Sequence, residues 1–172
     1  MDWSGFELHP ETPPGGMELA RLHPGEGRDM SGYLDRFAAG FGVYGLQHLK
    51  MMPNTRRALA MAEFARDQGK LDDFRSRVMD ARWRYGRDIG DEAVLGELAA
   101  AAGLDADAAR HAADDAAYLG RLAAIRKEFK RLGVGGIPTF AFPRESIEGC
   151  RPYAELSAAA LRSGARPRTG SV

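Results

Sequence analysis

Cysteine is nearly absent from this sequence of 172 residues, which contains only Cys150. One cysteine cannot form a disulfide within the chain, and it cannot form a thiolate metal cluster. The four histidines, His9, His23, His48 and His111, also lack the spacing that places two ligands on one helix face. We therefore expect no metal site, and we interpret the histidines as surface or half-buried residues.

Long apolar runs and an excess of charge are absent as well. No stretch reaches the roughly 18 to 20 apolar residues of a membrane span, and the first residues resemble no signal peptide. Lysine and arginine together number 24, as do aspartate and glutamate, so the formal net charge is zero. A neutral chain has no bulk attraction to nucleic acid or to membranes. We expect a cytoplasmic protein with neither as a partner.

Apolar residues recur at helical intervals through the middle of the chain. This spacing predicts helices within 30–42, 53–69, 71–86 and 90–103. Asn54 suits the N-cap of the second helix and Gly69 its end. Its buried side is marked by Leu59, Ala62, Phe64 and Ala65, and Trp83 is expected in the core. Residues 104–133 predict two helices that break near Gly120, or one kinked helix.

Short apolar segments flank this helical block. Residues 1–8 alternate loosely and predict a strand with a bulge at Ser4 and Gly5. Residues 138–142 and 146–150 predict a β-hairpin, and 151–164 predict an amphipathic helix. The order of strand, helices, hairpin and helix indicates a small α/β unit that carries a helical insertion.

Pro138 opens the first strand of the predicted hairpin, after three glycines at 133, 135 and 136. A proline donates no hydrogen bond to the ladder, so it is tolerated as the first residue of a strand. A cis bond between Ile137 and Pro138 is the second interpretation, although only about one X–Pro bond in twenty is cis in folded proteins.

An ordered set of short motifs carries a resemblance to a known family. The motifs are FELHPETPPGG at 6–16, MPNTRRA at 52–58, GRDIGDEAVL at 86–95, AAGLD at 101–105, GVGGIPTF at 133–140 and EGCRPY at 148–153. The set resembles the DsbA-like branch of the thioredoxin superfamily, and more closely its FrnE-type and 2-hydroxychromene-2-carboxylate isomerase-like members. The resemblance implies an α/β fold in which residues 1–27 and 134–172 form a thioredoxin-like unit, with 28–133 as a large all-helical insertion domain.

The resemblance assigns a substrate-binding loop to Ile137, Pro138 and Thr139. In the family this is the cis-proline loop, which holds a bound peptide by main-chain hydrogen bonds without reading its sequence. The implied partner is a peptide that contains a thiol or a disulfide, or a small thiol. This part of the prediction favours the cis isomer at Pro138.

The resemblance also implies a Cys-x-x-Cys motif at the start of the first helix, where the helix dipole activates the thiol. These 172 residues contain no such motif, and they resemble the family from its second strand onward. We therefore assign no catalytic residue and expect a catalytically incomplete relative of the thiol–disulfide oxidoreductases. Cys150 is a candidate redox thiol, although burial beneath the last helix is the favoured interpretation for a lone cysteine.

Two other functions fit the same residues. One is a glutathione-dependent isomerase or transferase, with glutathione as a candidate cofactor. Arg56 and Arg57 could attract such an anion, although a solvated helix face is the favoured interpretation of these two residues. The other is a peptide-binding module without catalysis. In either case the thioredoxin fold contains a central strand that these 172 residues do not supply. The strands on either side of it, at residues 1–8 and from Pro138, would then keep unpaired edges. We expect a homodimer in which residues 1–8 pair with the hairpin or with a second copy.

Overall fold

The computed structural model of the protein describes residues 2–22 and 30–167, which form two compact units. Unit 1 extends to Ile125, and unit 2 comprises the residues from Arg126 onward. This division differs from the domains expected from the sequence, because the N-terminal segment packs with the helices of unit 1. The expected boundary between residues 27 and 28 lies outside the described residues.

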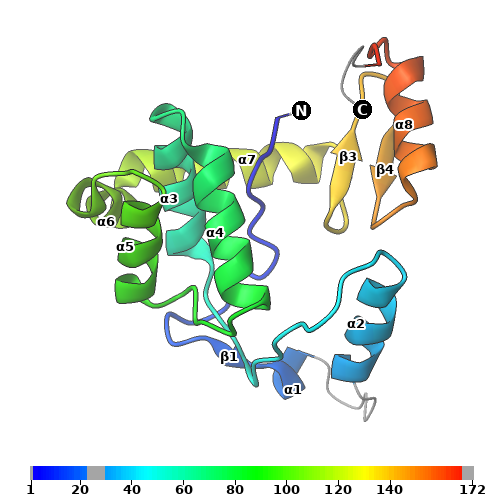
Figure 1. Cartoon of the computed structure of the whole chain (residues 1–172). Helices are drawn as coiled ribbons and strands as arrows, with labels where there is room; N and C mark the ends of the chain where they lie inside the picture. Colours follow the sequence, from blue (N-terminus) through cyan, green and yellow to red (C-terminus); the bar gives the residue numbers. More distant parts are fainter. Residues whose placement is uncertain (1, 23–29, 168–172) are drawn as a thin grey trace. The chain divides into compact units, whose positions relative to one another are not determined.

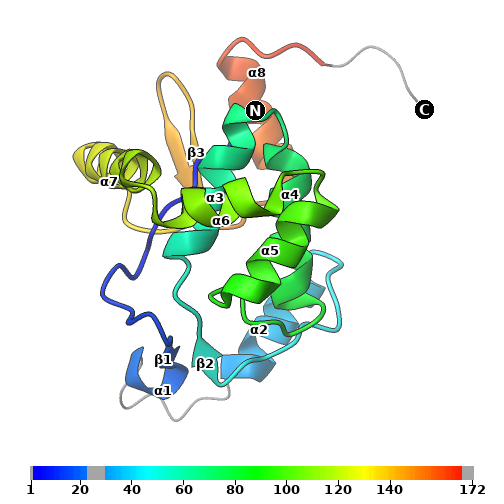
Figure 2. The same cartoon turned by 90° about the vertical axis from the view of Figure 1, so that its left-hand side faces the viewer.

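Helices dominate unit 1, as the apolar periodicity predicts (Figure 1). Both views place four of them side by side, α3 to α6 (Figures 1 and 2). The helices of this unit are α1 (Leu19–Leu22), α2 (Met30–Ala39), α3 (Arg56–Asp67), α4 (Leu71–Trp83), α5 (Glu92–Ala101), α6 (Ala106–Asp114) and α7 (Ala116–Arg131), whose last turns belong to unit 2. None of the described helices is both long and apolar enough to cross a membrane.

The chain breaks between α6 and α7 at Asp115, so the predicted break at Gly120 is wrong. Asp115 has an extended backbone, and its Oδ1 accepts a hydrogen bond from the Ala117 N–H at 2.6 Å. Such a side chain satisfies a free donor at the start of α7. Gly120 lies inside α7, where a glycine costs about 1 kcal/mol relative to alanine.

Helix α3 begins one residue later than predicted, with Thr55 rather than Asn54 as its N-cap. The Asn54 side chain still serves the first turn, because its Oδ1 accepts the Arg56 N–H at 2.9 Å. Its Nδ2 donates to the Thr12 carbonyl at 2.6 Å. Asn54 therefore ties the proline-rich segment after residue 8 to the start of α3.

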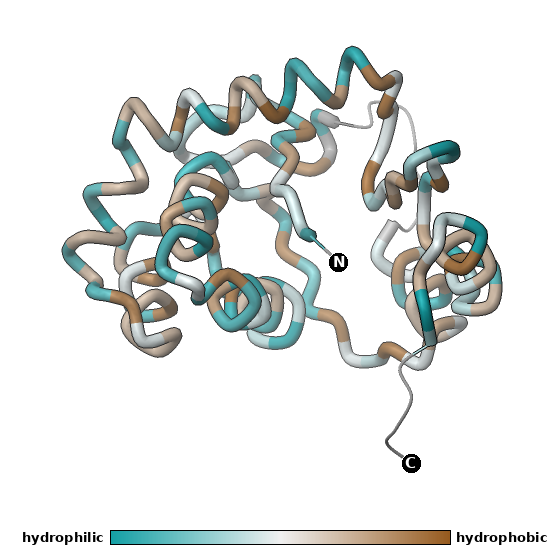
Figure 3. Tube along the Cα trace, turned by 90° about the horizontal axis from the view of Figure 1, so that it is seen from above, coloured by the Kyte–Doolittle hydropathy of each residue, from teal (hydrophilic) through white to brown (hydrophobic). Residues whose placement is uncertain are grey.

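The core of unit 1 lies among α3, α4, α5 and α6. Its largest fully buried side chains are Met61, Phe74 and Leu95. Alanines fill much of the rest, and their small side chains let the helices approach closely. Apolar and polar residues are interspersed along the helices (Figure 3), as expected for helices that bury one face and expose the other.

Two expectations about the buried residues need correction. Of the four α3 residues expected on the buried side, Ala65 is buried, while Leu59, Ala62 and Phe64 are half-buried. Trp83 is also half-buried rather than a core residue, because it is the last residue of α4. The guanidinium carbon of Arg82 lies 4.4 Å from its ring centroid.

The strand predicted at residues 1–8 is wrong for the described residues 2–8, which have no regular structure; Met1 lies outside them. Side chains hold this segment instead of a strand ladder. Arg66 forms an ion pair with Asp2 at 2.5 Å and also donates to the Trp3 carbonyl. Arg56 pairs with Glu7 at 2.8 Å. A Cβ on Gly5 would lie 2.6 Å from the Leu59 Cδ2, so the segment lies directly on α3.

A short antiparallel pair joins β1 (Met17–Glu18) to β2 (Met51–Met52), and the sequence did not predict it. Met17 pairs with Met52, and Glu18 pairs with Met51. Two residues are too few to show the alternation that identifies a strand. A Cβ on Gly16 would lie 2.7 Å from the Met52 carbonyl oxygen, and its φ of +81° suits glycine.

Unit 2 contains the predicted hairpin and terminal helix: β3 (Thr139–Ala141), β4 (Ser146–Glu148) and α8 (Tyr153–Arg162). The hairpin pairs Thr139 with Glu148, Phe140 with Ile147 and Ala141 with Ser146. Two nitrogens of the Arg162 guanidinium, on α8, donate to the Glu145 Oε1: Nε at 3.1 Å and Nη2 at 2.9 Å. This ion pair ties α8 to the turn of the hairpin.

Candidate substrate-binding loop

The candidate site is the loop that leads from α7 into β3. Helix α7 ends at Arg131 and is followed by Gly133, whose φ is +73° and whose N–H donates to the Lys130 carbonyl at 3.1 Å. The Val134 N–H donates to the Phe129 carbonyl at 3.0 Å, so a glycine-terminated helix end turns the chain. The loop then passes through Gly135 and Gly136 to the Ile137–Pro138 bond, which is cis, the isomer that the sequence predicts.

Hydrogen bonds fix the loop on both sides of Ile137. The Thr139 hydroxyl donates to the Gly136 carbonyl at 2.6 Å, and the Gly149 N–H donates to the Pro138 carbonyl at 2.7 Å. Ile137 itself is 52% exposed, and within the described part of the chain its backbone forms no hydrogen bond. Its N–H and C=O can therefore bind the backbone of an extended peptide.

Cys150 is exposed, so its predicted burial beneath the last helix is wrong. Strand β4 ends at Glu148, and Gly149, with a φ of +85°, turns the chain away from the hairpin. Pro152 then precedes α8 as its N-cap. Cys150 thus lies in a short connection that leaves its thiol open to solvent. Because Gly149 bonds to Pro138, this connection starts beside the loop.

Glu148 is a residue of this site that the sequence reasoning missed. A Cβ on Gly136 would lie 2.6 Å from the Glu148 Oε1, and one on Gly135 would lie 3.9 Å from it. The carboxylate therefore lies against the glycine backbone that precedes Ile137. Only the register of the hairpin, which pairs Glu148 with Thr139, places Glu148 beside the loop, and this register cannot be predicted from the sequence of either strand alone.

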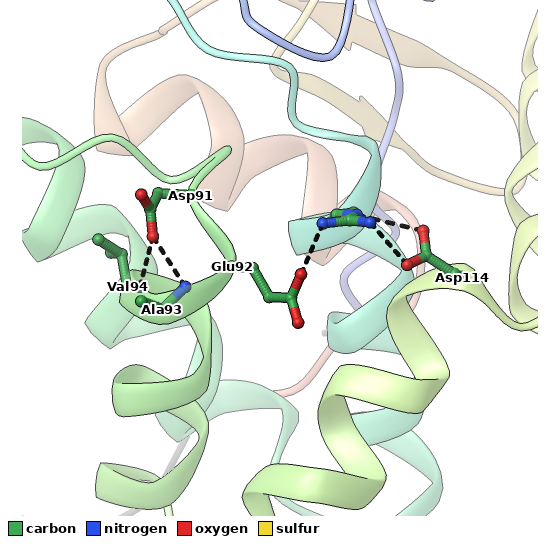
Figure 4. A network of polar contacts seen from close by, with 6 residues as sticks. Asp91, Glu92, Ala93, Val94 and Asp114 are labelled. Atoms are coloured by element: carbon green, nitrogen blue, oxygen red, sulfur yellow. Dashed lines mark hydrogen bonds and ion pairs between the residues drawn. The ribbon is translucent and has the colours of Figure 1, made fainter.

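The arginines expected to attract an anion belong to unit 1, and both have partners there. Arg57 bonds both oxygens of Asp114, at 3.1 and 2.8 Å, and Glu92 at 3.1 Å. Figure 4 shows the two carboxylates on either side of this guanidinium. The hydrogen bond that Arg57 donates to Asp114 raises the pKa of Arg57 above its ordinary value. Arg56 pairs with Glu7. Both side chains therefore connect parts of unit 1.

The described histidines also bond to neighbouring oxygen atoms. His48 Nε2 lies 2.9 Å from Asp35, His9 Nδ1 lies 3.1 Å from Glu11, and His111 Nδ1 lies 2.8 Å from the Asp107 carbonyl. His23 lies outside the described residues. Among the residues that are described, no three histidines, cysteines or carboxylates are placed to hold a metal ion.

A depression of about 550 Å³ lies in unit 1, and it contains none of the site residues predicted from the sequence. It lies between the N-terminal segment and the start of α4. Its charged lining includes Arg66, which is already paired with Asp2 and with Glu63, the latter at 3.3 Å. We therefore take the loop of unit 2 as the candidate site.

Comparison with known proteins finds a similar solved structure. A crystal structure of a probable DsbA oxidoreductase from Streptomyces coelicolor is similar to this chain, with a TM-score of 0.78 and 25% sequence identity. The match covers 97% of this chain and 76% of that one. No curated protein sequence matches the chain.

The family model of the DSBA-like thioredoxin domain matches residues 1–160, which is nearly the whole chain. The mixed α/β architecture is consistent with that fold and its helical insertion. The chain therefore belongs to the DSBA-like thioredoxin domain family.

Proposed function

We propose that this protein acts in thiol–disulfide exchange, and that its loop at Ile137, Pro138 and Thr139 binds the substrate. The substrate is a peptide with a thiol or a disulfide, or a small thiol. The observation that carries the proposal is the exposed Ile137, whose backbone forms no hydrogen bond within the described part of the chain. Membership of the DSBA-like family supports the choice of substrate.

The binding step is the addition of an extended strand. Thr139 begins β3, so a peptide aligned with Ile137 would continue along the direction of that strand. Main-chain hydrogen bonds supply the affinity, and pockets for alternate side chains supply the specificity. Because the loop is fixed by its bonds to Gly136 and Gly149, the backbone groups of Ile137 are held in position before the substrate arrives.

The chemical step that one thiol can perform is limited. The Cys150 thiolate would attack one sulfur of a substrate disulfide, form a new sulfur–sulfur bond and release the other substrate sulfur as a thiolate. A second thiol, from the substrate or from another molecule, must then attack this mixed disulfide to release it. These 172 residues contain no second cysteine for that role. We therefore propose substrate binding, rather than a complete dithiol cycle, as the function of this chain.

Two further parts of the proposal concern the setting of the protein. We propose a cytoplasmic location, where thiols are kept reduced and a lone exposed cysteine is tolerated. The homodimer expected from unpaired strand edges stays a prediction. Within the described residues β3 and β4 form a sheet of two strands, whose outer edges have no strand partner there.

Substitution of Ile137 tests the proposed function, because one backbone donor can be removed selectively. Ile137→Pro lacks the N–H that would donate to a bound peptide, whereas Ile137→Ala keeps it. We measure the binding of a fluorescent cysteine-containing peptide, under reducing conditions, by anisotropy. We expect Ile137→Pro to weaken binding by about five- to tenfold, the cost of roughly one net hydrogen bond, and Ile137→Ala to change it much less.

Both variants must first show the wild-type far-ultraviolet circular dichroism, so that a loss of binding is not a loss of fold. Equal binding by the two variants would contradict main-chain recognition at Ile137. An absence of binding to wild-type protein would contradict the proposed function as a whole.

A further inference from the structure

The carboxylate of Glu148 faces the proposed substrate loop without an ion-pair partner among the described residues. It lies against Gly136, the residue before Ile137, as the 2.6 Å approach to a Cβ at that position shows. Glycine is what leaves room for it. A larger residue would push the carboxylate aside, because the end of a glutamate side chain moves readily.

The hairpin register explains why Glu148 and the loop stay together. Glu148 pairs with Thr139, the first residue of β3, and the next residue, Gly149, donates to the Pro138 carbonyl. The side chains of paired residues lie on one face of a hairpin. A peptide held by the backbone of Ile137 would therefore bind next to this carboxylate.

One arginine bonds to the backbone of Glu148. The Arg151 Nε donates to the Glu148 backbone carbonyl at 3.2 Å, but the guanidinium forms no ion pair with the carboxylate. Two other arginines of this part of the chain form ion pairs of their own: Arg131 pairs with Glu128, and Arg162 pairs with Glu145. The charged group nearest to a Cβ position on Gly136, just before Ile137, is the negative Glu148 carboxylate.

We propose that Glu148 determines the substrate class of this loop, which is an extended peptide with a lysine or arginine beside its cysteine. This inference rests on the proposed function. An anionic thiol such as glutathione is disfavoured, because its net negative charge would meet the Glu148 carboxylate. The residue acts on specificity: it adds attraction for a cationic neighbour of the substrate cysteine and repulsion for an anionic one.

The expected preference is modest, because Glu148 is exposed to water. Exposed ion pairs are weak, and water screens the repulsion between like charges to a similar extent. A peptide with lysine beside its cysteine should therefore bind roughly two- to tenfold more tightly than the same peptide with glutamate there. The preference should vanish in about 1 M salt, where the Debye length is near 3 Å.

The test uses three reduced peptides that differ only at the residue beside cysteine, which is lysine, glutamine or glutamate. Their dissociation constants are measured with the wild-type protein and with Glu148→Gln, Glu148→Lys and Arg151→Gln. We expect Glu148→Gln to abolish the preference for lysine, and Glu148→Lys to reverse it. Arg151→Gln should increase the preference, because it removes the opposing charge.

Glu155→Gln is the matched control, because Glu155 is an exposed glutamate of the same unit, in the first turn of α8. It makes the same change in net charge and should leave the preference of the wild-type protein in place. Equal reductions by Glu155→Gln and Glu148→Gln would overturn the proposal, because bulk charge would then explain the effect.

The experiment separates this inference from the proposed function. If the glutamine peptide binds and requires the Ile137 N–H, but wild-type protein does not distinguish lysine from glutamate, only the role of Glu148 is overturned. If none of the three peptides binds, the proposed function fails and this inference fails with it.

Discussion

Asp2 and Arg66 are the residues that most directly hold the N-terminal segment on α3. The ion pair between them measures 2.5 Å, and Arg66 also bonds to the Trp3 carbonyl and to Glu63. The hydrogen bond from Arg66, followed by its charge, lowers the pKa of Asp2 below its ordinary value of 3.8. The folded protein therefore binds this proton less readily than the unfolded chain does.

We predict that Asp2→Asn destabilises the protein in a pH-dependent way. A lowered carboxyl pKa means that the stabilisation is fully present well above pH 3.8 and is lost as pH falls through the lower folded value. Because the Asp2 side chain is 80% exposed, we expect about 0.2 to 1 kcal/mol at pH 6. The free energy of unfolding, measured in urea from pH 6 to pH 3, should show this difference shrinking.

Asp72→Asn is the control for that titration, since Asp72 is similarly exposed and lies 3.9 Å from Arg75. It should change the free energy of unfolding much less. A difference between wild-type protein and Asp2→Asn that stays constant down to pH 3 would mean that the ion pair does not hold the segment.

Residues of the site that lie in one contiguous motif were predictable from the sequence. Residues that reach the site only through folding were not. GVGGIPTF contains the glycine-rich turn, Ile137 and Pro138 in one stretch, so the family resemblance identified them. Glu148 reaches the loop only through the pairing of β4 with β3. The exposure of Cys150 depends on the turn at Gly149, which a preference of lone cysteines for burial does not capture.

At the scale of elements, carboxylate caps decide where several helices begin. Asp91 accepts the N–H groups of Ala93 at 2.7 Å and of Val94 at 3.0 Å, at the start of α5 (Figure 4). Asp105 accepts the Ala108 N–H at 2.8 Å at the start of α6. These bonds satisfy donors that a helix leaves free at its first turn.

We predict that Asp91→Ala destabilises the protein by about 1 kcal/mol, the usual cost of losing an N-cap side chain. Asp91→Asn should cost much less, because an amide oxygen also caps helices well. Thermal or urea unfolding compares the two variants. Equal losses would mean that the negative charge of Asp91, rather than its hydrogen bonds, stabilises the start of α5.

Long periodic elements were predictable from the sequence, whereas short ones were not. Helices α3, α4 and α5 show several turns of apolar spacing, and the structure contains all of them. The alternation over residues 1–8 covers too few residues to distinguish a strand from an irregular segment that side chains hold in place. The break at Asp115 depends on a capping hydrogen bond from the Ala117 N–H, whereas the prediction relied on Gly120 as a helix breaker.

At the scale of the whole molecule, the two units differ in how much apolar surface they bury. Unit 1 contains the cluster around Met61, Phe74 and Leu95. In the described part of unit 2, Ala159 is the one fully buried hydrophobic residue. A hairpin with few buried contacts opens more easily than a helical core, and binding loops are commonly drawn from such regions. The proposed substrate loop therefore belongs to the less firmly packed of the two units.

The presence of one cysteine in all 172 residues sets what the molecule can do with a disulfide. A dithiol enzyme resolves its own mixed disulfide with a second thiol of the same chain, and this sequence has none.

We predict that protein of this sequence takes up at most one equivalent of a disulfide peptide, through the exposed Cys150, and does not catalyse repeated turnover of insulin disulfides. Mass spectrometry measures the adduct, and an insulin reduction assay measures the turnover. Cys150→Ser should form no adduct. Turnover by wild-type protein that this substitution abolishes would instead mean that thiols of two molecules act together, while turnover that survives it would require chemistry without cysteine.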